Sequence, residues 1–213
     1  MKFILFVEGY TENKALPQFL KKWLDPKLPN PVGIKTVRFE GWPELVKEAS
    51  IKARMHLDGP NNNEIIAVIS LLDLYGPTFY PDGLKESKKR YNWAKKEIED
   101  KVKQPKFFQF FAVHEVEAWL LSDPNISPVG IKKAFPKKIV NPEEVNFNEP
   151  PAKLLERLYP LHVRRSYKKV VNGKELFGKL DPSIAYNKCP SLKKFLDKML
   201  DLAINHGLSG FEK

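Results

Sequence analysis

The segment Phe3-Ile4-Leu5-Phe6-Val7-Glu8-Gly9-Tyr10-Thr11-Glu12 decides the fold of this chain. Its first five residues are apolar without a polar break, which is typical of a strand buried on both faces and therefore of a parallel sheet covered by helices. After Thr11, apolar positions recur at helical spacing, so we predict a strand that leads directly into a helix. We expect Thr11 to cap this helix, and Gly9 to supply a backbone geometry that other residues resist.

The same pattern recurs along the first 123 residues. Strands are predicted at 34–39, 64–72 and 107–113, and helical spacing of apolar residues separates them. Alternation of strand and helix is the pattern of right-handed βαβ units. We therefore predict an α/β domain over residues 1–123, with a parallel four-stranded sheet flanked by helices and a helix over 114–121 after the last strand.

The alternation stops beyond Pro124. The next segment, 124–151, is rich in Pro and Asn, and apolar residues return at helical spacing over 152–158 and 192–203. We predict a second part, residues 124–213, that is a basic, mostly helical, Pro-rich C-terminal extension packed on the first.

The net charge of +10 and the isoelectric point near 9.5 make a polyanionic partner plausible. Residues 123–213 carry 17 basic and 10 acidic side chains, a surplus of seven, against a surplus of three in residues 1–122. The alternative stays open, because Lys makes up 30 of the 36 basic residues and Lys enrichment is also a mark of heat-adapted surfaces.

Cysteine content and hydropathy indicate the cellular compartment in which the protein is expected. Cys189 is the single cysteine, which excludes an internal disulfide and a zinc site built from cysteines. No apolar run approaches the ~20 residues of a membrane span, and the short apolar run at the N-terminus lacks a cleavage site. We expect a cytoplasmic protein without a membrane partner; its oligomeric state is open.

Acidic residues follow three of the predicted strands. Glu8 and Glu12 follow the first strand, Asp73 the third, and Glu115 and Glu117 the fourth. Because the carboxyl ends of parallel strands meet at one edge of a sheet, we expect these carboxylates to converge there. They would repel one another without a cation, and oxygen ligands of this kind select Mg²⁺ or Mn²⁺. We predict catalytic roles for all five, with Glu8, Asp73 and Glu117 as metal ligands.

Each of these residues also has an ordinary structural explanation. Glu12, Glu115 and Glu117 could be first-turn acids that the helix dipole favours, and only one of the last two is expected to face the site. Asp73 could start a turn before Gly76-Pro77.

Three blocks of the chain resemble a known family, namely 7–12 (VEGYTE), 72–77 (LDLYGP) and 114–124 (HEVEAWLLSDP). The family is an uncharacterised Toprim-like one, related to the Toprim nuclease half of OLD-type (overcoming lysogenization defect) proteins. Segments 151–155, 167–169 and 189–195 resemble its C-terminal blocks, so the resemblance spans nearly the whole chain.

This resemblance implies Mg²⁺-dependent cleavage of nucleic acid, with DNA favoured over RNA, and pairing with an AAA-type or ABC-type ATPase in defence against foreign DNA. Glu8 would be the metal-bridging or general-base carboxylate, Glu12 its companion, and Asp73 the first acid of an Asp-x-Asp motif. Glu115 or Glu117 would be the acid of the third block. Tyr75 stands where that motif has its second acid, which puts two-metal catalysis in doubt.

Basic residues of the C-terminal part are candidates for binding the nucleic acid. They are Lys153, Arg164, Arg165, Lys168 and Lys169. A lysine near the acids would also add charge stabilisation, and Lys153, Lys168 and Lys169 are the candidates; each of them could instead be an ordinary surface lysine. Two other functions stay open. The chain could be a catalytically weak nucleic-acid-binding or regulatory subunit, or a metal-dependent enzyme that transfers or hydrolyses phosphate on a small molecule.

Overall fold

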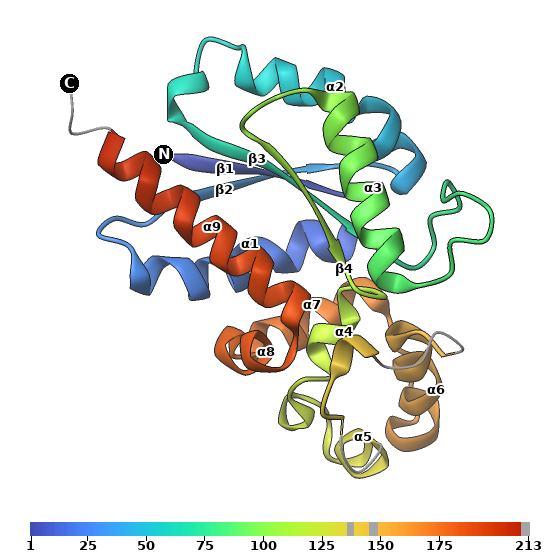
Figure 1. Ribbon diagram of the computed structural model, residues 1–213. Helices are drawn as coiled ribbons and strands as arrows, with labels where there is room; N and C mark the ends of the chain where they lie inside the picture. The colour runs from blue at the N-terminus through green and yellow to red at the C-terminus, as the bar shows by residue number, and fades with distance from the viewer. Residues whose placement is uncertain (136–138, 145–148, 210–213) are drawn as a thin grey trace.

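A parallel sheet forms the centre of the molecule, as predicted. The computed structural model describes residues 1–135, 139–144 and 149–209 (Figure 1). The strands are β1 (Lys2–Val7), β2 (Gly33–Arg38), β3 (Ile65–Asp73) and β4 (Phe107–Ala112), in the order β2-β1-β3-β4 with every neighbouring pair parallel. The predicted α/β fold class is therefore confirmed, and the two central strands are those that precede Glu8 and end at Asp73.

Helices cover both faces of the sheet. Helices α2 (Trp42–Leu57) and α3 (Ser87–Val102) lie on one face, and α1 (Tyr10–Leu24) and α9 (Pro190–Ser209) lie on the other (Figure 1). Side chains of β1 alternate between the two cores: Ile4 and Phe6 pack toward α2 and α3, whereas Phe3, Leu5 and Val7 pack toward α1 and α9. This two-sided burial explains the uninterrupted apolar run in the sequence.

Short helices follow the sheet and occupy the lower part of Figure 1. They are α4 (Glu117–Leu120), α5 (Val129–Ala134), α6 (Pro151–Val163), α7 (Lys169–Lys179) and α8 (Pro182–Lys188). Turns of 3-10 helix lie at Asp25–Lys27, Asn62–Glu64, Pro124–Ile126 and Pro142–Glu144. The core on the α1 side contains buried residues from before and after residue 123, for example Phe19, Trp119 and Phe195. The proposed division into 1–123 and 124–213 stays a prediction.

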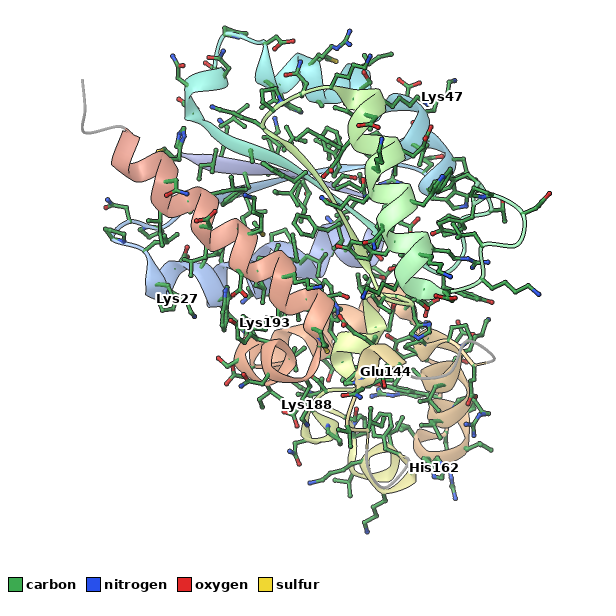
Figure 2. The ribbon with its side chains drawn as sticks, in the orientation of Figure 1. Lys27, Lys47, Glu144, His162, Lys188 and Lys193 are labelled. Atoms are coloured by element: carbon green, nitrogen blue, oxygen red, sulfur yellow. The ribbon has the colours of Figure 1, made fainter. Side chains whose placement is uncertain are left out.

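Part of the basic surface in the C-terminal part is engaged locally. Lys188 and Lys193 lie on α8 and α9 (Figure 2), where Lys188 donates to the Ser122 carbonyl at 2.6 Å and Lys193 forms an ion pair with Asp197 at 3.2 Å. Among the described residues, no helix combines the length and apolar character needed to cross a bilayer.

The start of α1 differs from the prediction. Its N-cap residue is Gly9, without a side-chain cap, so Thr11 does not cap the helix; Thr11 is buried in its first turn. Gly9 has φ −141° and ψ 175°, an extended conformation open to any residue, so the predicted need for a special backbone was wrong.

The helix predicted over 114–121 is shorter than expected. His114 adopts a left-handed φ of 65°, and α4 begins only at Glu117. The Tyr75 N–H donates to the His114 carbonyl at 2.9 Å, so the chain still pairs with the segment after β3 before it turns. This turn separates the directions in which Glu115 and Glu117 project.

Candidate functional site

Glu8 and Asp73 lie side by side at the carboxyl ends of the two central strands. In the register of β1 and β3, Val7 is paired with Leu71, which brings Glu8 next to the end of β3. The Asp73 N–H donates to Glu8 Oε1 at 3.4 Å. Burial, followed by the charge of Glu12, raises the pKa of Glu8 to about 7, and burial with the charge of Glu8 raises the pKa of Asp73 well above its usual range.

Glu12 joins this pair from the first turn of α1. Its side chain is 4% exposed, and its carboxylate folds back over Gly9, where an added Cβ would lie 2.6 Å from Glu12 Oε2. Gly9 therefore provides space rather than an unusual backbone. Burial raises the pKa of Glu12, although Lys169 acts in the opposite direction.

Glu115 and Glu117 have different surroundings. Glu115 Oε2 accepts a hydrogen bond from the Ala152 N–H at 2.9 Å, at the start of α6, so Glu115 stabilises a helix N-terminus. Glu117 is fully buried, and burial raises its pKa to about 7 against the lowering effect of Lys169. Val116, the residue between them, is held at the site by a backbone hydrogen bond: its N–H donates to Asp73 Oδ1 at 3.0 Å.

Lys169 lies among the acids, as expected for a lysine near the site; its predicted role in nucleic-acid binding stays a prediction. Its Nζ is 3.4 Å from Glu117 Oε2 and 4.0 Å from Asp73 Oδ2. Burial lowers the pKa of Lys169, but the carboxylates of Glu117 and Asp73 outweigh this effect and raise it overall. We call Glu8, Glu12, Asp73, Glu115, Glu117 and Lys169 the acidic cluster.

Close packing of α7 on α1 brings Lys169 to this position. At Gly173, an added Cβ would lie 2.8 Å from the Thr11 Cγ2 methyl and 3.5 Å from the Tyr167 hydroxyl. Since Thr11 sits in the first turn of α1, this contact fixes the start of α7 next to the acids. Lys169 is the first residue of α7.

Several polar atoms of the site lack hydrogen bonds. Both carboxylate oxygens of Glu117 and the hydroxyl of Tyr167 are buried without a hydrogen-bond partner among the described residues. Burying an ionised carboxylate without hydrogen bonds destabilises the folded protein by roughly several kcal/mol, unless a ligand or cation binds the carboxylate. Glu117 is therefore the side chain that most strongly indicates a missing ligand.

The donor set fits a hard divalent cation in chemistry, but its present arrangement does not hold one. Carboxylate oxygens are the ligands that Mg²⁺ and Mn²⁺ take, and the unsatisfied Glu117 oxygens are available for such an ion. Within the part of the chain that the structure describes, however, no three Asp, Glu, His or Cys side chains are placed to hold a metal together. Lys169 contacts two of the candidate ligands.

The remaining basic candidates lie outside the acidic cluster. Lys153, Arg164, Arg165 and Lys168 are exposed. Lys153 forms an ion pair with Glu156 at 2.6 Å, which raises the pKa of Lys153, and the charge of Glu115 adds to this effect. Arg164 has a left-handed φ of 57° at the end of α6. Their role in nucleic-acid binding stays a prediction.

Lys169 was one of the lysines expected near the acids, but α7, the helix that carries it, was missed at the level of sequence. The buried residues of α7, Asn172, Gly173, Leu176 and Phe177, do follow helical spacing, and this signal could have located the helix. Nothing in that spacing indicates which acids α7 would meet.

Comparisons with known proteins agree with this architecture. The C-terminal region of the Burkholderia pseudomallei OLD protein matches at 18% identity with a TM-score of 0.50, covering 94% of this chain and 98% of that one. At this identity the match shows a shared fold. No curated protein matches the chain. The family described as Domain of unknown function (DUF4276) matches residues 7–200, and the chain therefore belongs to that family.

Proposed function

We propose that this protein is a Toprim-like nuclease that hydrolyses nucleic-acid phosphodiesters with the help of Mg²⁺ or Mn²⁺. The observation that carries the proposal is Glu117, a fully buried carboxylate with two unsatisfied oxygens, at an edge where Glu8, Glu12 and Asp73 also converge. The fold shared with the C-terminal region of an OLD protein supports it. An ATPase partner and a role in defence against foreign DNA belong to the same proposal.

Three carboxylates would hold the metal and one lysine would add positive charge. Glu8, Asp73 and Glu117 are the proposed ligands, because Glu8 and Asp73 lie at adjacent strand ends and the charges of Glu8 and Glu117 both act on Asp73. A bound divalent cation would polarise a phosphoryl oxygen and activate a water. Lys169 would place its ammonium near the charge that develops on the phosphate.

Glu8 is the proposed general base. Its pKa of about 7 in the metal-free site means that this carboxyl can exchange a proton near neutral pH, and a bound cation would lower that pKa. Glu12 contacts the same region and would position Glu8 through its charge. Glu115 would act indirectly, by anchoring α6 beside the site.

A cleavage assay tests the proposal directly. Purified protein is incubated with end-labelled single-stranded and duplex DNA and RNA, with Mg²⁺, Mn²⁺ or EDTA. We expect metal-dependent cleavage that Glu8→Gln abolishes, whereas Glu97→Gln, which neutralises an exposed acid on α3, leaves it intact. Cleavage in EDTA, or cleavage that survives Glu8→Gln, would refute the proposed site.

A second candidate function is a nucleic-acid-binding or regulatory subunit with weak turnover. It is favoured by Tyr75, which is 41% exposed at the position of the second motif acid, and by the lack of a preformed three-ligand arrangement in the described chain. Binding of nucleic acid without cleavage in any metal would support it. Hydrolysis of small phosphoesters without polymer cleavage would instead indicate the small-molecule enzyme.

A further inference from the structure

The ammonium of Lys169 occupies the space in which the proposed metal ligands meet. It lies 3.4 Å from Glu117 Oε2 and 4.0 Å from Asp73 Oδ2, and the charges of Glu12 and Glu115 also act on it. We propose that Lys169 is a resident counter-cation, which holds the metal-free acidic cluster together and must be displaced when a divalent cation binds. The inference rests on the proposed metal-dependent function and concerns how the same site is controlled.

When no metal is bound, the carboxylates of the acidic cluster need another positive charge to reduce their mutual repulsion. The carboxyl groups of Glu8, Glu12, Asp73 and Glu117 act on one another electrostatically, and those of Glu12, Asp73 and Glu117 are buried. Like charges at such distances oppose ionisation, and burial adds a desolvation cost. Lys169 is the oppositely charged group that lies within 4.0 Å of two of these buried acids, Asp73 and Glu117.

The ammonium and a divalent cation are incompatible in this position. Mg²⁺ requires oxygen ligands at about 2.0–2.1 Å in near-octahedral geometry. No three acidic side chains of the described chain are arranged to hold an ion, and the Lys169 ammonium lies within 4.0 Å of two proposed ligands. Both Glu117 oxygens also remain without hydrogen bonds, because Lys169 is near Glu117 Oε2 but does not form one. The lysine therefore balances charge without satisfying the carboxylate, which leaves Glu117 able to exchange it for a metal.

The position of Lys169 on α7 lets the side chain leave. Lys169 begins the helix, directly after the exposed Lys168, and its own side chain is 38% exposed. A lysine has a flexible four-carbon stem, so its ammonium can move off the carboxylates toward the solvent side of the site, where the phosphate would bind, while the helix stays docked. The backbone of α7 is held independently, through the contact of Gly173 with Thr11.

Metal titration distinguishes this exchange from ordinary electrostatics. Mn²⁺ binding is measured by calorimetry for the wild-type chain, Lys169→Met, Lys169→Arg and Lys174→Met; Lys174 is an exposed residue of the same helix. A competing side chain lowers apparent affinity by the fraction of protein in which it has moved away. We expect Lys169→Met to bind Mn²⁺ roughly tenfold more tightly than wild type. Lys169→Arg and Lys174→Met should remain within about twofold of wild type.

Amine labelling tests the exchange in the unaltered protein. Reactivity of each lysine toward an acetylating reagent is measured by peptide mass spectrometry with and without Mg²⁺. Displacement should raise labelling of Lys169 several-fold, on the order of the population shift, while Lys174 stays constant. Unchanged or reduced labelling of Lys169 when calorimetry shows bound metal would overturn the inference.

The outcomes separate this inference from the proposed function. Equal Mn²⁺ affinity of wild type and Lys169→Met would overturn the counter-cation role and leave the nuclease proposal standing. Binding by Lys169→Met alone would uphold the counter-cation role and refute a metal-dependent function of the natural chain. Absence of binding to both proteins would overturn both.

Discussion

The acids and the lysine of the site come from regions that are built in different ways. Glu8 and Asp73 extend from adjacent strands, whose backbone hydrogen bonds set their relative positions. Lys169 comes from α7, which is placed by side-chain packing against α1. Regular backbone pairing thus concentrates negative charge at one edge, and helix packing supplies the charge that balances it. The two contributions should respond differently to mutation.

The largest expected effect is on catalysis, from the acidic side of this comparison. Glu117→Gln removes a proposed ligand but keeps the size of the side chain, so cleavage should fall by roughly a hundredfold or more. Stability without metal should be unchanged or higher, since a buried ionisable group becomes neutral. Single-turnover cleavage and urea unfolding measure the two effects. Full activity in Glu117→Gln would remove this residue from the site.

The next effect is on stability as a function of pH. The pKa values of Glu8 and Glu117 are raised from 4.5 to about 7 in the folded protein, so the folded state holds protons that the unfolded chain releases. The metal-free protein should therefore lose stability as the pH rises from about 4.5 to about 7, by on the order of a few kcal/mol.

Urea unfolding in EDTA at pH 5 and pH 8 measures this loss. Saturating Mg²⁺ should reduce it, because the metal binds the ionised carboxylates. Glu117→Gln should show a smaller pH dependence than wild type. Equal stability at both pH values in EDTA would contradict the burial of these acids.

Two glycine substitutions on α7 test whether packing against α1 positions this helix. Gly173→Ala would introduce a Cβ 2.8 Å from Thr11 Cγ2, so we expect a loss of about 1–3 kcal/mol and a displaced Lys169. Gly178→Ala, on the same helix, has no heavy atom within 4 Å of its new Cβ and should be neutral or stabilising. Thermal unfolding distinguishes the two, and equal melting temperatures would show that α7 is not tightly docked.

The smallest effect is expected at Glu115, which separates its role from that of Glu117. Glu115→Ala removes the acceptor for the Ala152 N–H, so stability should fall by about 1 kcal/mol, with a modest loss of activity. Loss of cleavage as large as that of Glu117→Gln, at unchanged stability, would instead place Glu115 in direct contact with the reaction.

Much of the fold could be predicted from the sequence because its signals are local. The strands at 34–39, 64–72 and 107–113 were predicted to within one or two residues of β2, β3 and β4. Apolar runs bounded by turns report burial on both faces regardless of what covers them. The predicted helices at 152–158 and 192–203 correspond to α6 and α9, which extend further at both ends.

Errors arose where a residue type has several uses. Thr11 was predicted as a helix cap because hydroxyls favour that position, yet its methyl packs against Gly173 instead. Gly9 was interpreted through backbone freedom, whereas the carboxylate of Glu12 needs the space. Both choices depend on neighbours that are close in space, and one of these neighbours is more than a hundred residues away in the chain.

The sequence by itself determined that the chain forms a parallel sheet and that acids follow three of its strands, because a strand's burial and direction are visible in consecutive residues. Only the tertiary structure decided that Glu115 supports a helix while Glu117 is buried with unsatisfied oxygens. It also placed Lys169, and not Lys153 or Lys168, within 4.0 Å of two of these acids. The physical reason is that a buried charge is defined by its surroundings, and packing of distant segments creates those surroundings.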